Sequence, residues 1–221
     1  MRSSPTIALG GDLVAPRMGY GAMRLCGPGI MGPPADPALA VLRRVVELGV
    51  RLIDTADAYG PSINEEQIAQ ALWMYPEDLV IATKGGSTRP GGRWVPDGRP
   101  EHLRQACEGS LQRLRLGAID LYQLHGPDPN VPYAESIGAL AQLRAAGKIR
   151  HVGISNVSVA QLDVARAIVP IASVQNRYNI GERSSEDVLR ACERHGIAFL
   201  PYFPIAAGSL AKAGGALARV A

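Results

Sequence analysis

Residues 119–154 read IDLYQLHGPDPNVPYAESIGALAQLRAAGKIRHVGI, and this stretch decides the fold class. It opens with the apolar, β-rich run Ile119–Leu124 and closes with a second such run, His151–Ile154. Between them lies a segment that ends at Gly147 and carries apolar residues at helical spacing: Leu140, Leu143 and Ala146. A strand, a helix and a strand in this order predict a βαβ unit with two parallel strands.

The same alternation runs along most of the chain. Ahead of it, Thr6–Leu9 and Leu13–Ala15 flank the turn residues Gly10-Gly11-Asp12 and predict a β-hairpin. Ser158 and Ser184 are expected to cap the last two helices. Seven runs are expected to form strands, six of them followed by a helix: Met18–Ala22, Leu52–Thr55, Leu79–Thr83, Ile119–Leu124, His151–Ile154, Ser173–Gln175 and Ile197–Pro201.

This pattern predicts an α/β protein with a parallel sheet, in one domain over residues 1–221. Two architectures compete, an open doubly wound sheet and a TIM-type (β/α)8 barrel. An open sheet that binds nucleotides usually carries G-x-G-x-x-G after its first strand, whereas Gly19-Tyr20-Gly21 is followed by Ala22-Met23-Arg24. The missing fingerprint, together with polar residues just after the strands, favours the barrel.

Composition excludes several classes of protein. The chain has 221 residues, of which 47% are hydrophobic and 19% charged, with a formal net charge of +3. These values are ordinary for a globular protein and argue against disorder or nucleic-acid binding. Cys26, Cys107 and Cys192 form no Cys-x-x-Cys, and no apolar run reaches about 18 residues. The N-terminus lacks the apolar stretch of a signal peptide, so a reduced, cytoplasmic compartment is expected.

Chemistry-bearing side chains follow three successive strands. Asp54, Lys84 and His125 each stand at a strand's carboxyl end, with Tyr59 in the loop after Asp54. A tyrosine beside a buried lysine should have a lowered pKa and act as a general acid toward a carbonyl oxygen. Asp54 would keep the lysine charged, and His125 would orient the substrate. The reaction class is polar addition to a carbonyl.

Each of these residues also has an ordinary structural interpretation. A lysine after a strand is usually a solvated charge, a single histidine is usually structural, and Asp57 is an alternative as a helix-capping acid. Trp94, in the loop that follows the third strand, either contacts substrate or anchors the loop. A metal-dependent hydrolase is disfavoured because too few His or acidic ligands converge, so no metal is expected.

The motifs in order resemble the aldo-keto reductase superfamily. The resemblance spans nearly the whole chain, and the region Gly19–Gly29 with Gly32-Pro33-Pro34 is similar to bacterial members related to pyridoxal reductases. The motifs that carry it are IDTADAYG at 53–60, Thr83-Lys84, DLYQLH at 120–125, GKIRHVGISN at 147–156, Val174-Gln175-Asn176 and Pro201-Tyr202-Phe203-Pro204.

The resemblance implies a TIM barrel that binds NADPH and reduces aldehydes or ketones. It implies a catalytic tetrad of Asp54, Tyr59, Lys84 and His125, with Tyr59 as proton donor. Ser155, Asn156 and Gln175 would hold the nicotinamide carboxamide, and Tyr202 would stack on its ring. The full set of cofactor-binding residues implied is Gly21, Met23, Ser155, Asn156, Gln175, Tyr202, Phe203, Pro204, Ser209 and Leu210.

The chain is shorter than the family pattern. Residues 208–221 are expected to supply only the start of a seventh helix, and the eighth βα unit, which carries the basic residues for the adenosine 2′-phosphate, has no counterpart. The barrel would then have open edges that invite self-association. The alternatives to an active reductase are a catalytically impaired barrel remnant and a subunit that needs a partner chain.

Overall fold

The computed structural model describes residues 5–31, 36–212 and 214, so residues 32–34 of the subtype resemblance lie outside it. Within these residues, seven parallel strands form one sheet in the order β11-β10-β9-β8-β5-β4-β3. They are β3 (Tyr20–Gly21), β4 (Leu52–Asp54), β5 (Val80–Gly85), β8 (Ile119–Leu124), β9 (Ile149–Ser155), β10 (Ile171–Gln175) and β11 (Ala198–Phe199). Every predicted strand is therefore confirmed in sequence order, although β3 and β11 are shorter than expected.

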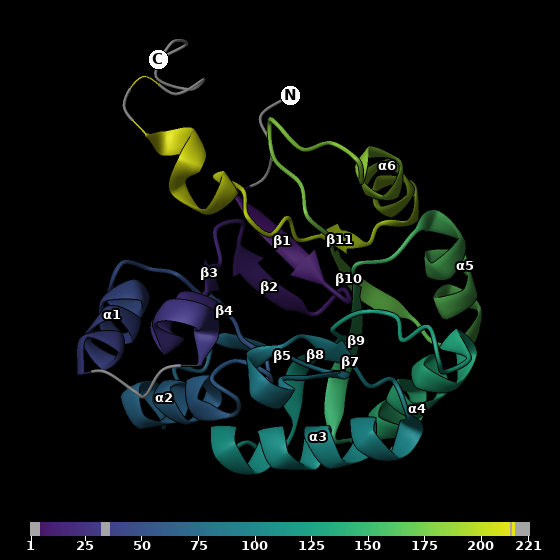
Figure 1. The fold of residues 1–221 in the computed structure, drawn as a ribbon, viewed down its shortest axis with the longest axis horizontal. Coiled ribbons are helices and arrows are strands. Elements are labelled where there is room, and N and C mark those ends of the chain that lie inside the picture. Colours follow the sequence, from purple (N-terminus) through teal and green to yellow (C-terminus); the bar gives the residue numbers. More distant parts are fainter. Residues whose placement is uncertain (1–4, 32–35, 213, 215–221) are drawn as a thin grey trace.

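Helices cover the outer face of this curved sheet, following one another around it from α1 to α6 (Figure 1). The sheet is a curled half-barrel of the (β/α)8 type, and its edge strands β3 and β11 do not pair with each other. The helices are α1 (Asp36–Glu47), α2 (Ile63–Leu72), α3 (Pro100–Leu114), α4 (Tyr133–Ala145), α5 (Val159–Ile168) and α6 (Glu186–His195). Short 3-10 turns lie at Ala22–Cys26, Pro28–Ile30, Pro90–Gly92 and Ala206–Ala211.

One of the two predicted helix caps is confirmed. The Ser158 hydroxyl accepts from the Gln161 backbone N–H, and the Gln161 side chain accepts from the Ser158 N–H, so α5 starts with a capping box. The prediction for Ser184 is wrong, because α6 is preceded by Ser185 and has no side-chain cap. Instead Glu186 and Asp187 place negative charge in its first turn. Residues 208–211 of the stretch 208–221 belong to the 3-10 turn Ala206–Ala211 and not to a seventh α-helix.

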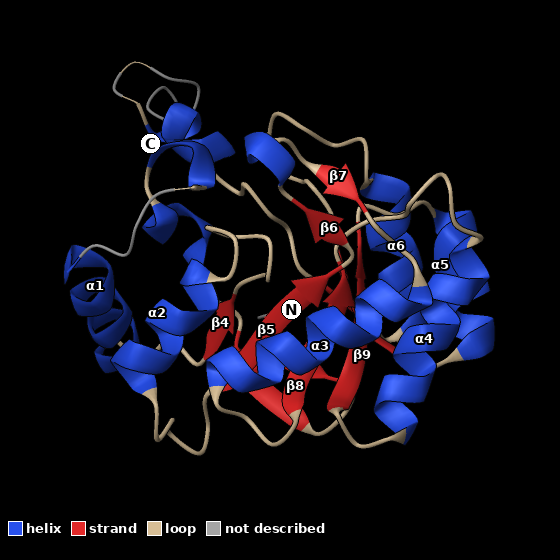
Figure 2. Cartoon of the chain, turned by 60° about the horizontal axis from the view of Figure 1, so that its bottom comes forward, coloured by secondary structure: helices blue, strands red, loops and turns tan. Residues whose placement is uncertain are grey.

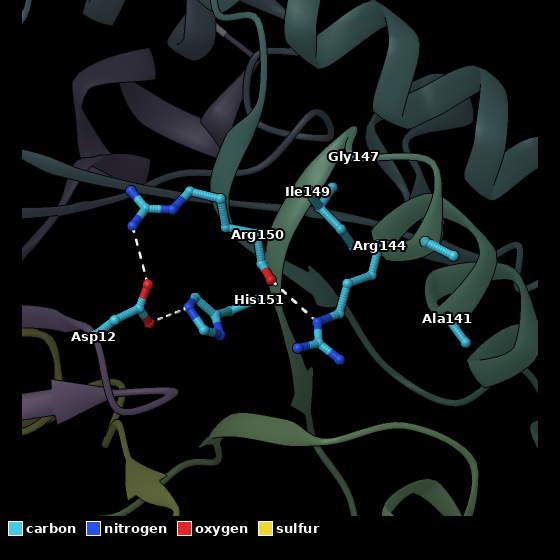
Figure 3. Close-up of a pocket in the computed structure, with 8 residues that line it drawn as sticks. Asp12, Ala141, Arg144, Gly147, Ile149, Arg150 and His151 are labelled. Carbon is cyan, nitrogen blue, oxygen red and sulfur yellow. Dashed lines mark hydrogen bonds and ion pairs between the residues drawn. The ribbon is translucent and has the colours of Figure 1, made fainter.

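The predicted hairpin forms from β1 (Thr6–Leu9) and β2 (Leu13–Pro16) and closes the amino-terminal end of the barrel. Leu9, Leu13 and Ala15 pack against inward-facing residues of the sheet, among them Leu52 and Leu121. At the hairpin tip, Asp12 accepts from Arg150 and pairs with His151 of β9. Figure 3 shows these side chains beside a groove of about 540 Å³ that Arg144 also lines.

A buried polar link joins two helices to the sheet. Glu65 of α2 has 0% side-chain exposure and accepts from Arg113 of α3 at 2.7 Å. Its second carboxylate oxygen accepts from the Thr83 hydroxyl of β5 at 2.6 Å. Arg113 retains 21% exposure. Both oxygens of a carboxylate removed from water are therefore satisfied, as such a group requires.

Strand alternation decides which residues reach the opposite, carboxyl-terminal end of the barrel. Leu52, Ala82 and Leu121 face the barrel interior. Because side chains alternate along a strand, the residue two positions later points inward too. Those residues are Asp54, Lys84 and Gln123. Beyond the carboxyl ends of the strands lies a small antiparallel hairpin of β6 (Ser87–Thr88) and β7 (Val95–Pro96), shown in Figure 2.

Candidate functional site

The centre of the site is an ion pair between Lys84 and Asp54. The Lys84 Nζ lies 2.7 Å from Asp54 Oδ2 and donates to the Thr55 carbonyl at 2.8 Å, and its side chain is only 1% exposed. Burial, the largest single effect, lowers the pKa of Lys84, but the charges of Asp54 and Tyr59 and the hydrogen bonds to both together outweigh it, so the net shift is upward. Lys84 is therefore a positive charge fixed at the carboxyl end of the sheet.

Two side-chain amides hold the other oxygen of Asp54. Gln123 Nε2 of β8 donates to Asp54 Oδ1 at 3.1 Å, and Gln175 Nε2 of β10 donates to the same atom at 3.0 Å. Asp54 thus accepts hydrogen bonds from three other strands. Asp57, the alternative acid, takes no part in this pair and caps no helix, since the residue before α2 is Ser62.

Three aromatic rings meet edge to face above this ion pair. Tyr59 and His125 have ring centroids 5.7 Å apart, and Trp94 lies 6.2 Å from Tyr59 and 5.4 Å from His125. Lys84 Nζ is 5.3 Å from the Tyr59 ring centroid. The structure therefore brings together Asp54, Tyr59, Lys84 and His125, the four residues predicted to act on a carbonyl.

The expected direction of the Tyr59 pKa shift is wrong. Burial raises the pKa of the Tyr59 hydroxyl, and the positive charge of Lys84 only partly offsets this. The phenol accordingly stays protonated at neutral pH, as a proton donor must be. Burial, with help from Lys84 and Arg89, lowers the pKa of His125 to about 3, which makes it a neutral imidazole.

A polar cluster adjoins the rings at the carboxyl ends of β9 and β10. Asn156, at a φ of 59°, donates through Nδ2 to the His125 carbonyl at 2.9 Å. The Tyr202 hydroxyl donates to Asn156 Oδ1 at 2.8 Å. The Ser155 hydroxyl donates to the Gln175 carbonyl at 2.7 Å. The four residues expected at the nicotinamide are therefore linked to one another and to the tetrad.

The remaining predicted cofactor residues lie on both sides of this cluster. Gly21 pairs in register with Asp54, and Met23 packs on the apolar cluster that includes Tyr59. Phe203 is edge to face with Tyr202 at 5.4 Å, and Pro204 beside it is exposed. Ser209 and Leu210 belong to the 3-10 turn, and their hydrogen bonds among the described residues go to Ala206 and Ile205 of the same segment.

Sequence reasoning missed Gln123 and Arg89. Gln123 stands two residues before His125 in a strand, so the alternation rule could have placed both on one face. Arg89 lies in a loop rich in Gly and Pro, where no periodicity marks a functional residue. Two absences hold for the described part of the chain: it contains no group of three His, Cys, Asp or Glu suited to a metal, and none of its helices could cross a bilayer.

The family is now defined by both sequence and fold. The aldo/keto reductase family model matches residues 17–220, and the chain belongs to this family. An oxidoreductase of Schizosaccharomyces pombe is 46% identical over 207 residues, which cover 92% of this chain and 67% of that protein. Pyridoxine 4-dehydrogenase of Escherichia coli is 41% identical over 213 residues, which cover 92% of this chain and 74% of the enzyme.

Solved structures of the family superpose well on this chain. The glycerol dehydrogenase of Gluconobacter oxydans has a TM-score of 0.85 at 35% identity, and the match covers 95% of this chain and 65% of that one. An aldo/keto reductase from Klebsiella pneumoniae in complex with NADP and acetate has a TM-score of 0.78 at 28% identity, covering 96% and 72%. The chain thus spans about two thirds to three quarters of the length of these relatives.

Proposed function

We propose that this chain is a reductase that converts an aldehyde or ketone to an alcohol with NADPH, using Tyr59 as proton donor. The observation that carries the proposal is the buried Lys84–Asp54 ion pair at 2.7 Å, with its ammonium 5.3 Å from the Tyr59 ring. Family membership and a neighbour in complex with NADP support it.

The residues at the ends of β9 and β10 fit the cofactor chemically. Beside them on β8, Gln123 Oε1 is buried and has no hydrogen-bond partner among the described residues, so an acceptor is left over next to the site, and Tyr202 is partly exposed. Amide and hydroxyl groups of this kind can hold a carboxamide, which we assign to Ser155, Asn156 and Gln175, and Tyr202 would lie against the ring. Bound NADPH supplies the hydride that reduces the carbonyl carbon.

The chain's own residues supply the proton and stabilise the charge that its loss creates. Tyr59 donates its hydroxyl proton to the carbonyl oxygen as that oxygen gains negative charge, so the phenol O–H bond breaks and an alcohol O–H bond forms. The phenolate left behind is stabilised by the positive charge of Lys84. Neutral His125 donates a hydrogen bond to the same substrate oxygen and orients it. Asp54 keeps Lys84 charged through the cycle.

The first test is a fluorescence titration of the purified chain with NADPH and, in parallel, NADH. Saturable NADPH binding is expected. A substrate panel follows, which includes pyridoxal because of the pyridoxine 4-dehydrogenase relative, and glycerol with NADP in the oxidative direction because of the glycerol dehydrogenase neighbour. A folded chain that binds neither nucleotide would instead favour the impaired remnant or the subunit that requires a partner.

The mechanism is tested with Tyr59→Phe. We expect turnover to fall about 10²- to 10⁴-fold, the usual contribution of a general acid, with NADPH binding retained. Tyr178→Phe is the matched control, because its hydroxyl bonds Glu186 away from the tetrad. Unchanged turnover of a Tyr59→Phe variant that binds NADPH would show that Tyr59 is not the proton donor.

A further inference from the structure

Arg89 ties two parts of the site's rim together and is only 8% exposed. Its Nη2 donates to the Gly29 carbonyl at 2.9 Å and to the Gly92 carbonyl at 2.8 Å, and Nε donates to Gly92 at 3.1 Å. The φ angles of Gly91 and Gly92, 57° and 80°, let the chain turn back so that the Gly92 carbonyl reaches the guanidinium. One arginine therefore joins the loop after β5 to the segment before α1.

The same guanidinium stacks on Trp94, with its central carbon 4.1 Å from the indole ring centroid. The indole stays 45% exposed, and the contacts that the described residues make with it are contacts to its ring. The position of the indole thus depends on ring contacts. Arg89 lies over its face, and the rings of Tyr59 and His125 meet it edge to face. Of these neighbours, Arg89 is itself anchored by three hydrogen bonds, two to the Gly92 carbonyl of its own loop and one to the Gly29 carbonyl.

We propose that Arg89 is a positioning residue that holds the Trp94 indole against Tyr59 and His125, so that Trp94 forms a fixed wall of the carbonyl-binding site. A planar guanidinium can stack on a ring and donate in its own plane at once, whereas an ammonium group is a point charge with no flat face to stack. The placement of the indole stands on the contacts alone, and its role in substrate binding rests on the function proposed above.

The placement is tested by fluorescence without substrate. The chain has two tryptophans, so Trp73→Phe leaves Trp94 as the sole tryptophan, whose emission is followed with selective excitation. In that background Arg89→Met is expected to shift the Trp94 emission to the red and to raise its acrylamide quenching constant. Arg93→Met, which removes an exposed charge from the same loop, should leave both unchanged. Equal spectra for Arg89→Met and its parent, or equal changes in Arg93→Met, would overturn the proposal.

Arg89→Lys covers the case in which Arg89→Met does not fold, as judged by circular dichroism. It keeps the charge and the aliphatic stem but loses the planar fork, so it should show the same red shift. Parent-like emission of Arg89→Lys would mean that charge alone suffices, and would overturn the stacking argument.

The effect on substrate is tested by steady-state kinetics with whichever carbonyl compound is turned over. Arg89→Met should raise KM about tenfold with a much smaller change in kcat, because the loss of a cation–π contact lowers the population of the competent wall. In a Trp94→Ala background the same substitution should change KM no further. If Arg89 were merely structural, its loss would still raise KM in that background. Absence of turnover in the parent would refute the proposed function, while the fluorescence result would still decide the placement.

Discussion

Substitution of Arg113 by methionine should destabilise the chain far more than loss of a surface arginine. Arg113 is the charged partner of Glu65, whose carboxylate is completely buried between α2, α3 and β5. In Arg113→Met the carboxylate keeps only the hydrogen bond from Thr83. The protein must then either hold an unpaired charge in its interior or protonate it, and both lower the free energy of unfolding.

The expected loss is about 3–5 kcal/mol, the usual cost of removing one partner of a buried pair. For a domain of this size that corresponds to a fall in Tm of roughly 6–20 °C. Glu65→Gln should cost less, about 1–3 kcal/mol, because the remaining charge is Arg113, which is 21% exposed and can be hydrated. Arg113→Met should therefore lose more stability than Glu65→Gln, because it leaves its charge on the residue that water cannot reach.

The assay is urea unfolding at neutral pH, followed by far-ultraviolet circular dichroism. Arg104→Met serves as control, because Arg104 lies on the same helix and its side chain is exposed. The double variant Glu65→Gln with Arg113→Met should lose less than the sum of the two single changes, since each removes a partner of the same contact. If Arg113→Met unfolds at the same urea concentration as Arg104→Met, the ion pair does not stabilise the fold.

Three further outcomes are expected. Asp12→Asn should lower stability at neutral pH. Burial raises the pKa of Asp12, but the charge of His151 and the hydrogen bonds from Arg150 and His151 together hold it below 3.8. The stability gained from Asp12 should shrink as the pH falls through that pKa, and a constant gap in urea midpoint between pH 5 and pH 3 would contradict this. The NMR ring signals of His125 should not shift between pH 5 and pH 8, given its pKa of about 3; a titration in that interval would refute this. Burial raises the pKa of the three cysteine thiols, to about 11 for Cys26 and about 12 for Cys107 and Cys192. Native protein should therefore resist iodoacetamide, and denatured protein should gain three labels by intact mass. Labelling of the native protein would show that one of these thiols is accessible.

The backbone plan was predictable because each buried strand leaves a mark in the sequence. Val80–Gly85 is buried at every position and reads as an unbroken apolar run up to Thr83 and Lys84. Parallel neighbours end at the same edge, so the sequence alone places Asp54, Lys84 and His125 together. No long-range contact has to be known to group these three residues into one site.

The features that the sequence does not predict depend on the relative size of opposing effects on a pKa or on the geometry of a loop. The pKa of Tyr59 is set by burial against the charge of Lys84, and only the packing tells which effect is larger. Arg89 meets Gly29 across 60 residues of sequence through a loop whose path is fixed by glycine φ angles. Ser184 and Ser185 are both acceptable cap residues by type, and a one-residue choice at a helix end lies within ordinary boundary uncertainty.

Asp54 also imposes an order of events on a chain leaving the ribosome. Its partner Lys84 follows it by 30 residues, whereas Gln175 follows it by 121. At about 5–20 residues per second, Gln175 is synthesised roughly 6–24 s after Asp54. During that interval the aspartate can meet Lys84 and then Gln123, but its last amide donor does not yet exist. Nascent chains released before and after the synthesis of Gln175 should therefore differ around Asp54. The ion pair with Lys84 forms first, and the hydrogen bond from Gln175 forms last.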